Sequence, residues 1–424
     1  MKEYSYWLDT VAPPPIEGES RRPGRVDVAI VGAGYTGLAA ARQLARAGAA
    51  VVVFEREHVG WGASSRNGGQ VLTGMKVEPA GLVARFGEAG ARRLFEISLE
   101  SIDALERLIA SEKIDCEHER TGHLQAASKP SHFAAFREEQ TLLHRVFGHR
   151  VELLSAAEQH AEIGSAAYHG LMIDEASGAL NPAKYVFGLA SAARRAGAAI
   201  AEREAVRRVT RRGSRWTLTT AAREVDAADV LWATNGYTNG AAAGLSRRLV
   251  PIGSYIVATA PIGEAVAASL LPRGRVAFDS RHFLHYFRVT RDRRLLFGGR
   301  AEFTTPDAEA TSRAATILAG ELARVFPVLA GVTIEYAWGG QVAFTRDQLP
   351  RAGRLDAAYY AGGYCGHGIA MATALGTLIA RRISGEAIDH PLIDDRFAPI
   401  PLYRGRPWFL PLVGAWYRLK DLAD

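Results

Sequence analysis

The chain has 424 residues, of which 48% are hydrophobic, enough for roughly two or three domain-sized units with substantial cores. No apolar run approaches the ~18 residues of a membrane-spanning helix, and the first residues lack the pattern of a secretory signal. Two cysteines are too few for a disulfide framework. We therefore expect a cytoplasmic protein.

The charge balance is basic, with a formal net charge of +6 and 45 arginines against six lysines. The arginines form short separate clusters such as Arg194-Arg195 and Arg247-Arg248, whereas a nucleic-acid-binding surface needs a longer basic stripe with interleaved aromatic residues. We interpret them as a solvated surface and expect no nucleic-acid partner. An anionic small-molecule substrate is compatible with this composition.

Residues 1–24 read as an extended N-terminal arm. Its aromatic residues Tyr4, Tyr6 and Trp7 can pack on the protein body, and Pro13-Pro14-Pro15 favours polyproline II.

The stretch from Val26 to Arg56 predicts a strand, a glycine turn, a helix and a second strand that ends in Glu55. The glycines of its GAGYTG turn are Gly32, Gly34 and Gly37. At this spacing they give a tight turn, let the backbone approach a pyrophosphate and let helix and strand pack closely. The helix N-terminus offers N–H groups to phosphates, and Glu55 stands where a ribose-binding acid is expected. The unit predicts dinucleotide binding.

A polar, glycine-rich segment follows at residues 58–70, HVGWGASSRNGGQ, and predicts a loop with an exposed backbone. Helical and alternating patterns then succeed one another. We expect helices over 81–115, 130–147, 182–196 and 307–325, and strands over 205–210, 216–220, 228–233, 254–258, 283–289, 295–298 and 333–337.

A second strand, glycine turn and helix lie at residues 357–385, far from the first unit in sequence. An NAD enzyme has little use for such a unit, whereas a flavin gains negative charge at one ring edge when it is reduced. A helix N-terminus with N–H groups from Gly366 to Ile369 would stabilise that charge. The alternation of elements predicts a nucleotide-binding domain assembled from several pieces, with a substrate domain inserted between them.

Together these marks resemble the FAD-dependent amine and amino-acid oxidoreductases related to D-amino-acid oxidase, glycine oxidase and sarcosine oxidase. The matching segments are GAGYTG with Glu55, GWGASSRNGGQV, VLWATNGY, WGGQVAFTRDQLPRAG and GGYCGHGIAMAT, spread over residues 25–385. SYWLDT, HYFR followed by LLFGG, and the C-terminal WYRLKDL are similar to the branch of this family that oxidises γ-glutamylputrescine.

The resemblance implies an α/β fold. It consists of a discontinuous Rossmann-like FAD-binding domain of the glutathione-reductase type and an inserted α+β substrate domain built on an antiparallel sheet. The expected divisions are an arm, 1–24; FAD-binding parts, 25–80, 166–245 and 338–386; substrate-domain parts, 81–165 and 246–337; and a C-terminal extension, 387–424.

The resemblance also implies which residues hold FAD. The adenylate half would be held by Gly32, Gly34, Tyr35, Thr36, Gly37, Glu55, Arg56, Val206, Ala233, Thr234 and Gly236. The loop along the pyrophosphate and flavin would contribute Gly62, Ala63, Ser64, Ser65, Arg66, Asn67, Gly68 and Gly69, and the flavin end Gly339, Cys365, Gly366, His367, Gly368 and Ile369. The segment from Gly339 to Thr345, which corresponds to the attachment site of sarcosine oxidase, has no cysteine. We therefore expect FAD to be bound non-covalently.

The implied reaction removes a hydride from the carbon next to a substrate amine, giving an imine or aldehyde and, with oxygen as acceptor, hydrogen peroxide. Because that carbon must lie close to the flavin, positioning and an apolar cage matter more than acid–base residues. No metal site is expected. Candidates for the cage and for catalysis are Tyr255, His285, Tyr286, Trp338, Tyr364 and His367, and Arg288 is the candidate to hold a substrate carboxylate.

Two alternatives stay open. Sarcosine oxidase uses a lysine for oxygen activation in a strand that resembles Leu295 to Arg300, where this chain has none, so Arg288, Arg300 or His367 would have to supply the positive charge. A dehydrogenase that passes electrons to a quinone or another non-oxygen acceptor is therefore an alternative. A second is an FAD-dependent activity on a nucleic-acid base, suggested by the high pI.

The last stretch, residues 401–417, combines aromatic residues with arginines. It either packs on the protein body or makes shallow contact with a membrane surface, because tryptophan and arginine suit the lipid interface.

Overall fold

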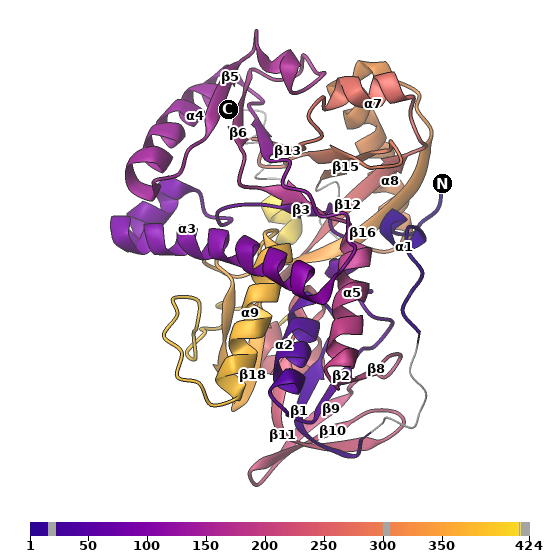
Figure 1. Cartoon of the computed structure of the whole chain (residues 1–424), viewed down its shortest axis with the longest axis vertical. Coiled ribbons are helices and arrows are strands. Elements are labelled where there is room, and N and C mark those ends of the chain that lie inside the picture. The colour runs from indigo at the N-terminus through magenta and orange to yellow at the C-terminus, as the bar shows by residue number, and fades with distance from the viewer. Residues whose placement is uncertain (16–22, 300–305, 415, 417–424) are drawn as a thin grey trace.

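Two eight-stranded sheets form the centre of the molecule, one in the lower half and one in the upper half of Figure 1. The chain is described by a computed structural model at residues 1–15, 23–299, 306–414 and 416. Arg300, a candidate for oxygen activation, and most of the C-terminal WYRLKDL segment lie outside these residues.

The first sheet is built from three separate parts of the chain. Its order is β17-β18-β11-β1-β2-β8, and β10 and β9 continue antiparallel from β11. The neighbours from β18 to β8 run parallel. The strands are β1 (Arg25–Val31), β2 (Val51–Phe54), β8 (Ala199–Ala201), β9 (Arg208–Arg212), β10 (Arg215–Thr219), β11 (Glu224–Trp232), β17 (Arg351–Leu355) and β18 (Ala358–Gly362). This confirms the expected discontinuous α/β domain.

Three helices lie side by side in front of this sheet in Figure 1. They are α2 (Tyr35–Arg46), α5 (Pro182–Arg195) and α9 (Gly368–Ile383). The predicted apolar face of α2 is buried, with Leu38 and Ala41 fully so. A Cβ at Gly376 of α9 would lie only 2.4 Å from the Thr36 carbonyl oxygen of α2, so a glycine allows the two helices to cross this closely.

The second sheet has the order β16-β12-β15-β14-β13-β4-β6-β5 and is antiparallel except where β13 pairs with β4. Its strands are β4 (His123–Ala126), β5 (Glu152–Ser155), β6 (Gly170–Asp174), β12 (Val250–Thr259), β13 (Val276–Asp279), β14 (Tyr286–Val289), β15 (Leu295–Gly299) and β16 (Ile334–Phe344). Two short strands, β3 (Gln70–Val71) and β7 (Gly178–Ala179), form a third small sheet.

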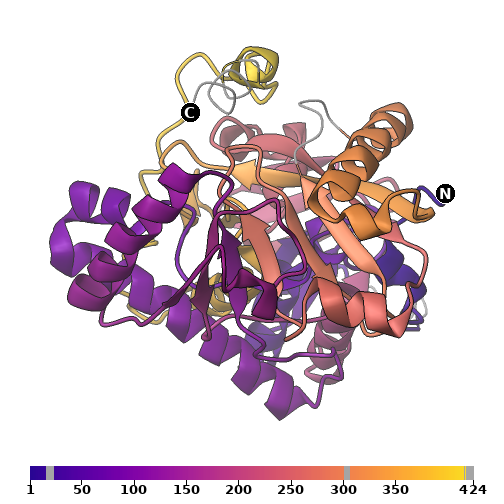
Figure 2. The ribbon, with the colours of Figure 1, turned by 90° about the horizontal axis from the view of Figure 1, so that it is seen from above.

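Helices flank the second sheet. Seen from above in Figure 2, the violet helices lie at the left of its strands and the orange helix at the right. They are α3 (Pro79–Glu112), α4 (Pro130–Leu142), which runs into a turn of π-helix at Leu143–Phe147, α7 (Glu264–Leu270) and α8 (Ala308–Val325); α6 (Ala243–Ser246) is a short turn near the first sheet. No helix among the described residues has the length and apolarity to cross a bilayer.

Two of the expected domain divisions differ from the strand pairing. β6 lies beyond residue 166 but pairs with β4 and β5 of the second sheet. β16 continues past residue 338 to Phe344 while paired with β12 along its length. Parts of the chain that were assigned to the FAD-binding domain therefore belong to the second sheet, because a local sequence pattern identifies a strand without naming its partner.

The described parts of the N-terminal arm and of the C-terminal extension both contribute side chains that pack on the body. In the arm, residues 6–9 form a short helix, α1 (Tyr6–Asp9), and Tyr6 and Trp7 are buried as expected while Tyr4 is exposed. In the C-terminal extension, Tyr403 and Leu410 join a small core cluster with Val250, Phe344 and Cys365. Its outer surface carries exposed apolar side chains at Leu402, Trp408, Leu412 and Trp416.

Candidate cofactor and substrate site

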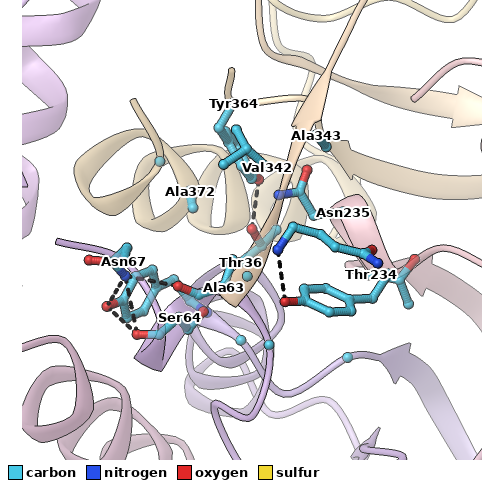
Figure 3. A pocket seen from close by; sticks show the side chains of 18 of the residues that line it. Thr36, Ala63, Ser64, Asn67, Thr234, Asn235, Val342, Ala343, Tyr364 and Ala372 are labelled. Carbon is cyan, nitrogen blue, oxygen red and sulfur yellow. Dashed lines mark hydrogen bonds between the residues drawn. The ribbon is translucent and has the colours of Figure 1, made fainter. Parts of the chain in front are cut away.

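A cavity of about 350 Å³ lies between the carboxyl ends of the first sheet's strands and the face of the second sheet. Its lining includes Val31, Phe54 and Trp232 from β1, β2 and β11, and Tyr286 and Val342 from β14 and β16. This is the edge of an open parallel sheet at which ligands bind, and the volume is that of a cofactor or ligand site. Figure 3 shows side chains from both domains meeting around it.

The first glycine turn brings the N-terminus of α2 to the cavity. Gly32 has a φ of +108°, and a Cβ there would lie 2.8 Å from the Ala233 carbonyl oxygen. A Cβ at Gly37 would lie 2.0 Å from the Gly32 carbonyl oxygen, so helix and strand meet backbone to backbone. The Tyr35 amide donates to Ser64 Oγ over 3.1 Å. The glycines thus let the start of α2 reach the cavity wall, the position at which a helix N-terminus can bind a phosphate.

Glu55 ends β2 at the cavity wall and is held by the backbone. The amides of Ala33 and Glu57 donate to its two carboxylate oxygens over 2.9 and 3.0 Å. Burial raises the pKa of Glu55 above its ordinary value, while these two amides act in the opposite direction. Each carboxylate oxygen has a further lone pair. Glu55 is therefore oriented and still able to accept hydrogen bonds from ribose hydroxyls.

The loop after β2 folds on itself around Asn67. The Asn67 side-chain amide donates to the Ala63 carbonyl over 2.9 Å, and its oxygen accepts from the Gly69 amide over 2.8 Å. Figure 3 shows this cluster of hydrogen bonds beside Ser64. Asn67 thus shapes the loop, and its side chain is engaged with protein groups.

The second glycine turn lies opposite the first and is tied to it. Tyr364 and Thr36 share a hydrogen bond of 2.6 Å between their hydroxyls, drawn in Figure 3. The Gly363 amide donates to Asn235 Oδ1 over 2.9 Å. Cys365 and Gly366 have φ values of +53° and +99°. These contacts and this backbone direct the chain so that α9 begins at the cavity with its N–H groups toward it.

His367 precedes α9 and lines the cavity. Burial, together with the nearby charge of Lys76, lowers the pKa of His367 to about 3, so its ring is neutral near pH 7. Among the described residues, its Nδ1 is a buried atom with no hydrogen-bond partner. A buried polar atom without a partner is costly, which points to a ligand group at this position.

Most of the residues expected to hold FAD line the cavity. These are Gly32, Gly34, Tyr35, Thr36, Glu55, Arg56, Gly62, Ala63, Ser64, Arg66, Asn67, Gly68, Val206, Ala233, Thr234, Cys365, Gly366, His367, Gly368 and Ile369. Behind this lining lie Gly37, Ser65, Gly69, Gly236 and Gly339. At Gly37, Gly69 and Gly339 a Cβ would come within 2.0, 2.4 and 2.7 Å of neighbouring atoms, so these positions support the wall by close packing.

The structure separates the expected catalytic residues into two groups. Tyr286, Tyr364 and His367 line the cavity. Tyr286 is fixed there, because its hydroxyl shares a hydrogen bond of 3.0 Å with Ser254 and its ring lies against Gly68.

The second group does not line the cavity. It consists of Tyr255, His285, Trp338 and Arg288, all of which the structure describes. Trp338 donates its indole N–H to the Arg66 carbonyl over 3.0 Å. Arg288 donates to the Gly69 and Leu180 carbonyls over 3.1 and 2.9 Å. Its guanidinium is therefore occupied by backbone oxygens and is not placed to hold a substrate carboxylate, contrary to the prediction.

Sequence analysis missed a cation at the cavity. Lys76, which follows the glycine-rich loop, is half-buried and lines the cavity, close enough to His367 for its charge to lower the pKa of that ring. Phe278, Leu284 and Tyr286 line the same cavity. The available signal for Lys76 was its rarity among six lysines and its position just beyond the loop. Whether Lys76 lies at the cavity depends on the path of the chain after β3, and no local sequence pattern predicts that path. Also missed were the lining residues Glu204, Tyr237 and Gln341.

A family model described as FAD dependent oxidoreductase, DAO, matches residues 27–382. The chain belongs to the DAO family of FAD-dependent oxidoreductases. A relative of this flavoprotein, gamma-glutamylputrescine oxidoreductase of Escherichia coli (strain K12), is 33% identical over 403 residues, covering 93% of this chain and 92% of the relative.

Solved structures share the fold of this oxidoreductase. Glycine oxidase from Geobacillus kaustophilus superposes with a TM-score of 0.76 at 23% identity, covering 89% of this chain and 99% of that one. L-proline dehydrogenase from P. horikoshii superposes with a TM-score of 0.70 at 22% identity, covering 88% and 96%. At such identities the likeness is one of fold.

The cavity suits the cofactor of the family. Gly32 and Gly34 with the start of α2 would hold its pyrophosphate, and Glu55 would hold a ribose. The start of α9 and the unpartnered His367 Nδ1 supply polar groups at the opposite end. The residues of this flavoprotein thus fit FAD from one end to the other.

Proposed function

We propose that this flavoprotein oxidises the C–N bond of an amine substrate that also carries a carboxylate. The observation that carries the proposal is the composition of the cavity wall, where Lys76, whose charge acts on His367, occurs together with the apolar side chains of Phe278, Leu284 and Tyr286. An apolar cage suits a neutral amine and its alkyl chain, and a half-buried ammonium suits an anionic end. The gamma-glutamylputrescine oxidoreductase relative supports a substrate with both features.

FAD, when bound, supplies the two-electron acceptor for this reaction. The carbon next to nitrogen loses a hydride and the nitrogen loses a proton, giving an imine that water hydrolyses to a carbonyl compound and the released amine or ammonia. Tyr286, held by Ser254, and Phe278 keep water from this part of the cavity. His367 stays neutral at working pH, so it adds no positive charge that would oppose the loss of a hydride from the substrate carbon.

We propose oxygen as the acceptor, which yields hydrogen peroxide. Lys76 supports this, because a cation at the cavity can stabilise the negative charge that develops as oxygen is reduced. The strand that resembles the lysine-bearing strand of sarcosine oxidase, β15, has no lysine, and this favours the alternative of a dehydrogenase that uses a quinone or another acceptor.

The test is anaerobic reduction followed by air. Holoenzyme is mixed without oxygen with γ-glutamylputrescine, putrescine and amino acids, and bleaching of the flavin absorbance is followed. Rapid bleaching by a carboxylate-bearing amine supports the proposed substrate class, and no bleaching by any amine overturns it. Rapid recovery of colour and formation of peroxide in air identify an oxidase, whereas slow recovery identifies the dehydrogenase.

A further inference from the structure

The carbonyl oxygens of the loop that lines the cavity are engaged from behind by side chains of distant elements. Three of the donors come from the N-terminal arm and from β14, and one from β16. The hydrogen bonds are Ser5 Oγ to the Ser65 carbonyl, 2.6 Å; Trp338 Nε1 to the Arg66 carbonyl, 3.0 Å; Trp7 Nε1 to the Asn67 carbonyl, 2.8 Å; and Arg288 Nη1 to the Gly69 carbonyl, 3.1 Å.

This pattern determines which way the loop amides point. A trans peptide is planar, and its N–H is directed opposite to its C=O. The carbonyls of Arg66 and Asn67 point to donors outside the cavity, so the amides of Asn67 and Gly68 point the other way. Asn67 and Gly68 both line the cavity. Fixed N–H groups aimed into a water-poor site stabilise negative charge on whatever binds there.

The loop needs external support at the carbonyls of Arg66 and Asn67, because the bonds that the Asn67 side chain makes within it engage the Ala63 carbonyl and the Gly69 amide instead. Its regular part is one turn of 3-10 helix at Ala63–Ser65, and two consecutive glycines, Gly68 and Gly69, follow. Glycine widens the range of accessible backbone conformations. Without outside donors, the peptides of Arg66 and Asn67 would have no reason to keep one orientation.

The donors are built to keep their positions. Ser5 and Trp7 are 1% exposed, Trp338 is 2% exposed and Arg288 is 8% exposed. The Arg288 guanidinium lies 5.4 Å from the centre of the Trp7 ring, so these two donors also hold each other. A buried cation needs such partners.

We propose that Ser5, Trp7, Trp338 and Arg288 are positioning residues that orient the amides of Asn67 and Gly68 toward bound FAD. Helix α1 of the N-terminal arm is then part of the cofactor site although it does not line the cavity. The arm thereby contributes to FAD affinity and to the reduction potential of the flavin. This rests on FAD binding and not on the identity of the substrate.

The test compares Trp7→Phe with Tyr6→Phe in the holoenzyme. Tyr6 is the matched control because it lies on the same helix, is buried, and donates to Asp292 over 2.6 Å rather than to the loop. The readouts are the FAD dissociation constant, from titration of apoprotein followed by flavin fluorescence, and the reduction potential, from equilibration with a reference dye.

Trp7→Phe leaves the Asn67 carbonyl without its indole donor, so we expect FAD to bind about tenfold more weakly, equivalent to about 1.4 kcal/mol. The loop amides should stabilise reduced flavin more than oxidised flavin, because the reduced ring carries more negative charge. A further tenfold loss for reduced FAD would lower the potential by about 30 mV. Tyr6→Phe should leave both quantities within twofold and within a few millivolts, on the same scale.

The proposal is overturned if Trp7→Phe matches Tyr6→Phe in both readouts, or if it lowers only the melting temperature. If Trp7→Phe does not fold, Ser5→Ala replaces it, because this change removes one hydroxyl and almost no volume. Ser5→Ala should weaken FAD binding in the same direction, and wild-type affinity and potential in that variant would equally refute the role of α1.

Discussion

Replacing Lys76 tests the proposed anionic end of the substrate. Lys76 is half-buried beside apolar side chains, so its ammonium would meet a carboxylate in a partly desolvated place. A hydrogen bond to a charged group contributes about 1.5–3 kcal/mol. Lys76→Met, which keeps most of the length of the side chain and removes its charge, should therefore lower kcat/KM for γ-glutamylputrescine by about 10- to 150-fold.

Two comparisons separate substrate recognition from general damage. Putrescine lacks the carboxylate, so its kcat/KM should fall less than threefold or rise in Lys76→Met. Lys76→Arg keeps the positive charge and should recover much of the loss for γ-glutamylputrescine. The assay is anaerobic flavin bleaching in a stopped-flow instrument, which separates the dissociation constant of the substrate from the rate of the reductive step without involving the acceptor.

A binding measurement covers the case in which the substrate is a different amine. N-butylglutaramate carries a carboxylate and an alkyl chain but no amine, and N-butylpentanamide is its uncharged counterpart. The acid should perturb the flavin spectrum of wild type at lower concentration than the amide, and Lys76→Met should abolish the difference. Equal loss for the charged and uncharged ligands in Lys76→Met would refute the role of Lys76 in holding a carboxylate.

Three further predictions follow from the site and its supports. Acid precipitation should release all the flavin into the supernatant, because the segment from Gly339 to Thr345 has no cysteine; flavin retained in the pellet would contradict non-covalent binding. Gly376→Ala should lower the free energy of unfolding by about 1–3 kcal/mol, because its Cβ would clash with the Thr36 carbonyl. Gly320→Ala in α8, where a Cβ meets no atom within 4 Å, should raise it by about 0.5–1 kcal/mol. Urea unfolding measures both changes. Because the pKa of His367 is lowered to about 3, the unfolded chain binds more protons than the folded one between that pH and about 6.5, so stability falls as pH drops through this window. His367→Gln should make this fall in the melting temperature of FAD-free protein shallower, and an unchanged slope would show that His367 is not held neutral.

Local signals were enough to predict the framework of the nucleotide site. Helix α5 begins where Asn181 and Pro182 predicted, with the Asn181 side chain accepting from the Lys184 amide over 3.2 Å. The two glycine turns and the starts of α2 and α9 were likewise visible, because glycine spacing and helix caps act over a few residues. The sequence predicted that both turns contact one cofactor, and in the structure residues of both turns line the same cavity.

Contacts made across the molecule could not be predicted in this way. Tyr286 and Arg288 are two residues apart on β14 and so share one face of the sheet. The sequence made both candidates for the substrate site, Tyr286 as part of an apolar cage and Arg288 as a partner for a carboxylate. The loop crosses this face, with Gly68 against the Tyr286 ring and Gly69 accepting from Arg288. It leaves Tyr286 in the cavity and covers Arg288, so the position of one loop decides which side chain can meet a ligand.

The same loop explains why the arm and the second sheet matter to a nucleotide site. The adenylate end of FAD would be held by elements that are adjacent in sequence, since β1, α2 and β2 follow one another. The flavin end depends on the Thr36–Tyr364 hydrogen bond and on carbonyls anchored by Trp7, Trp338 and Arg288. These contacts exist only after both domains have formed. Since FAD binds the folded state alone, its binding free energy adds directly to the stability of this assembly, and a weakened anchor should reduce FAD affinity and the thermal protection by FAD together.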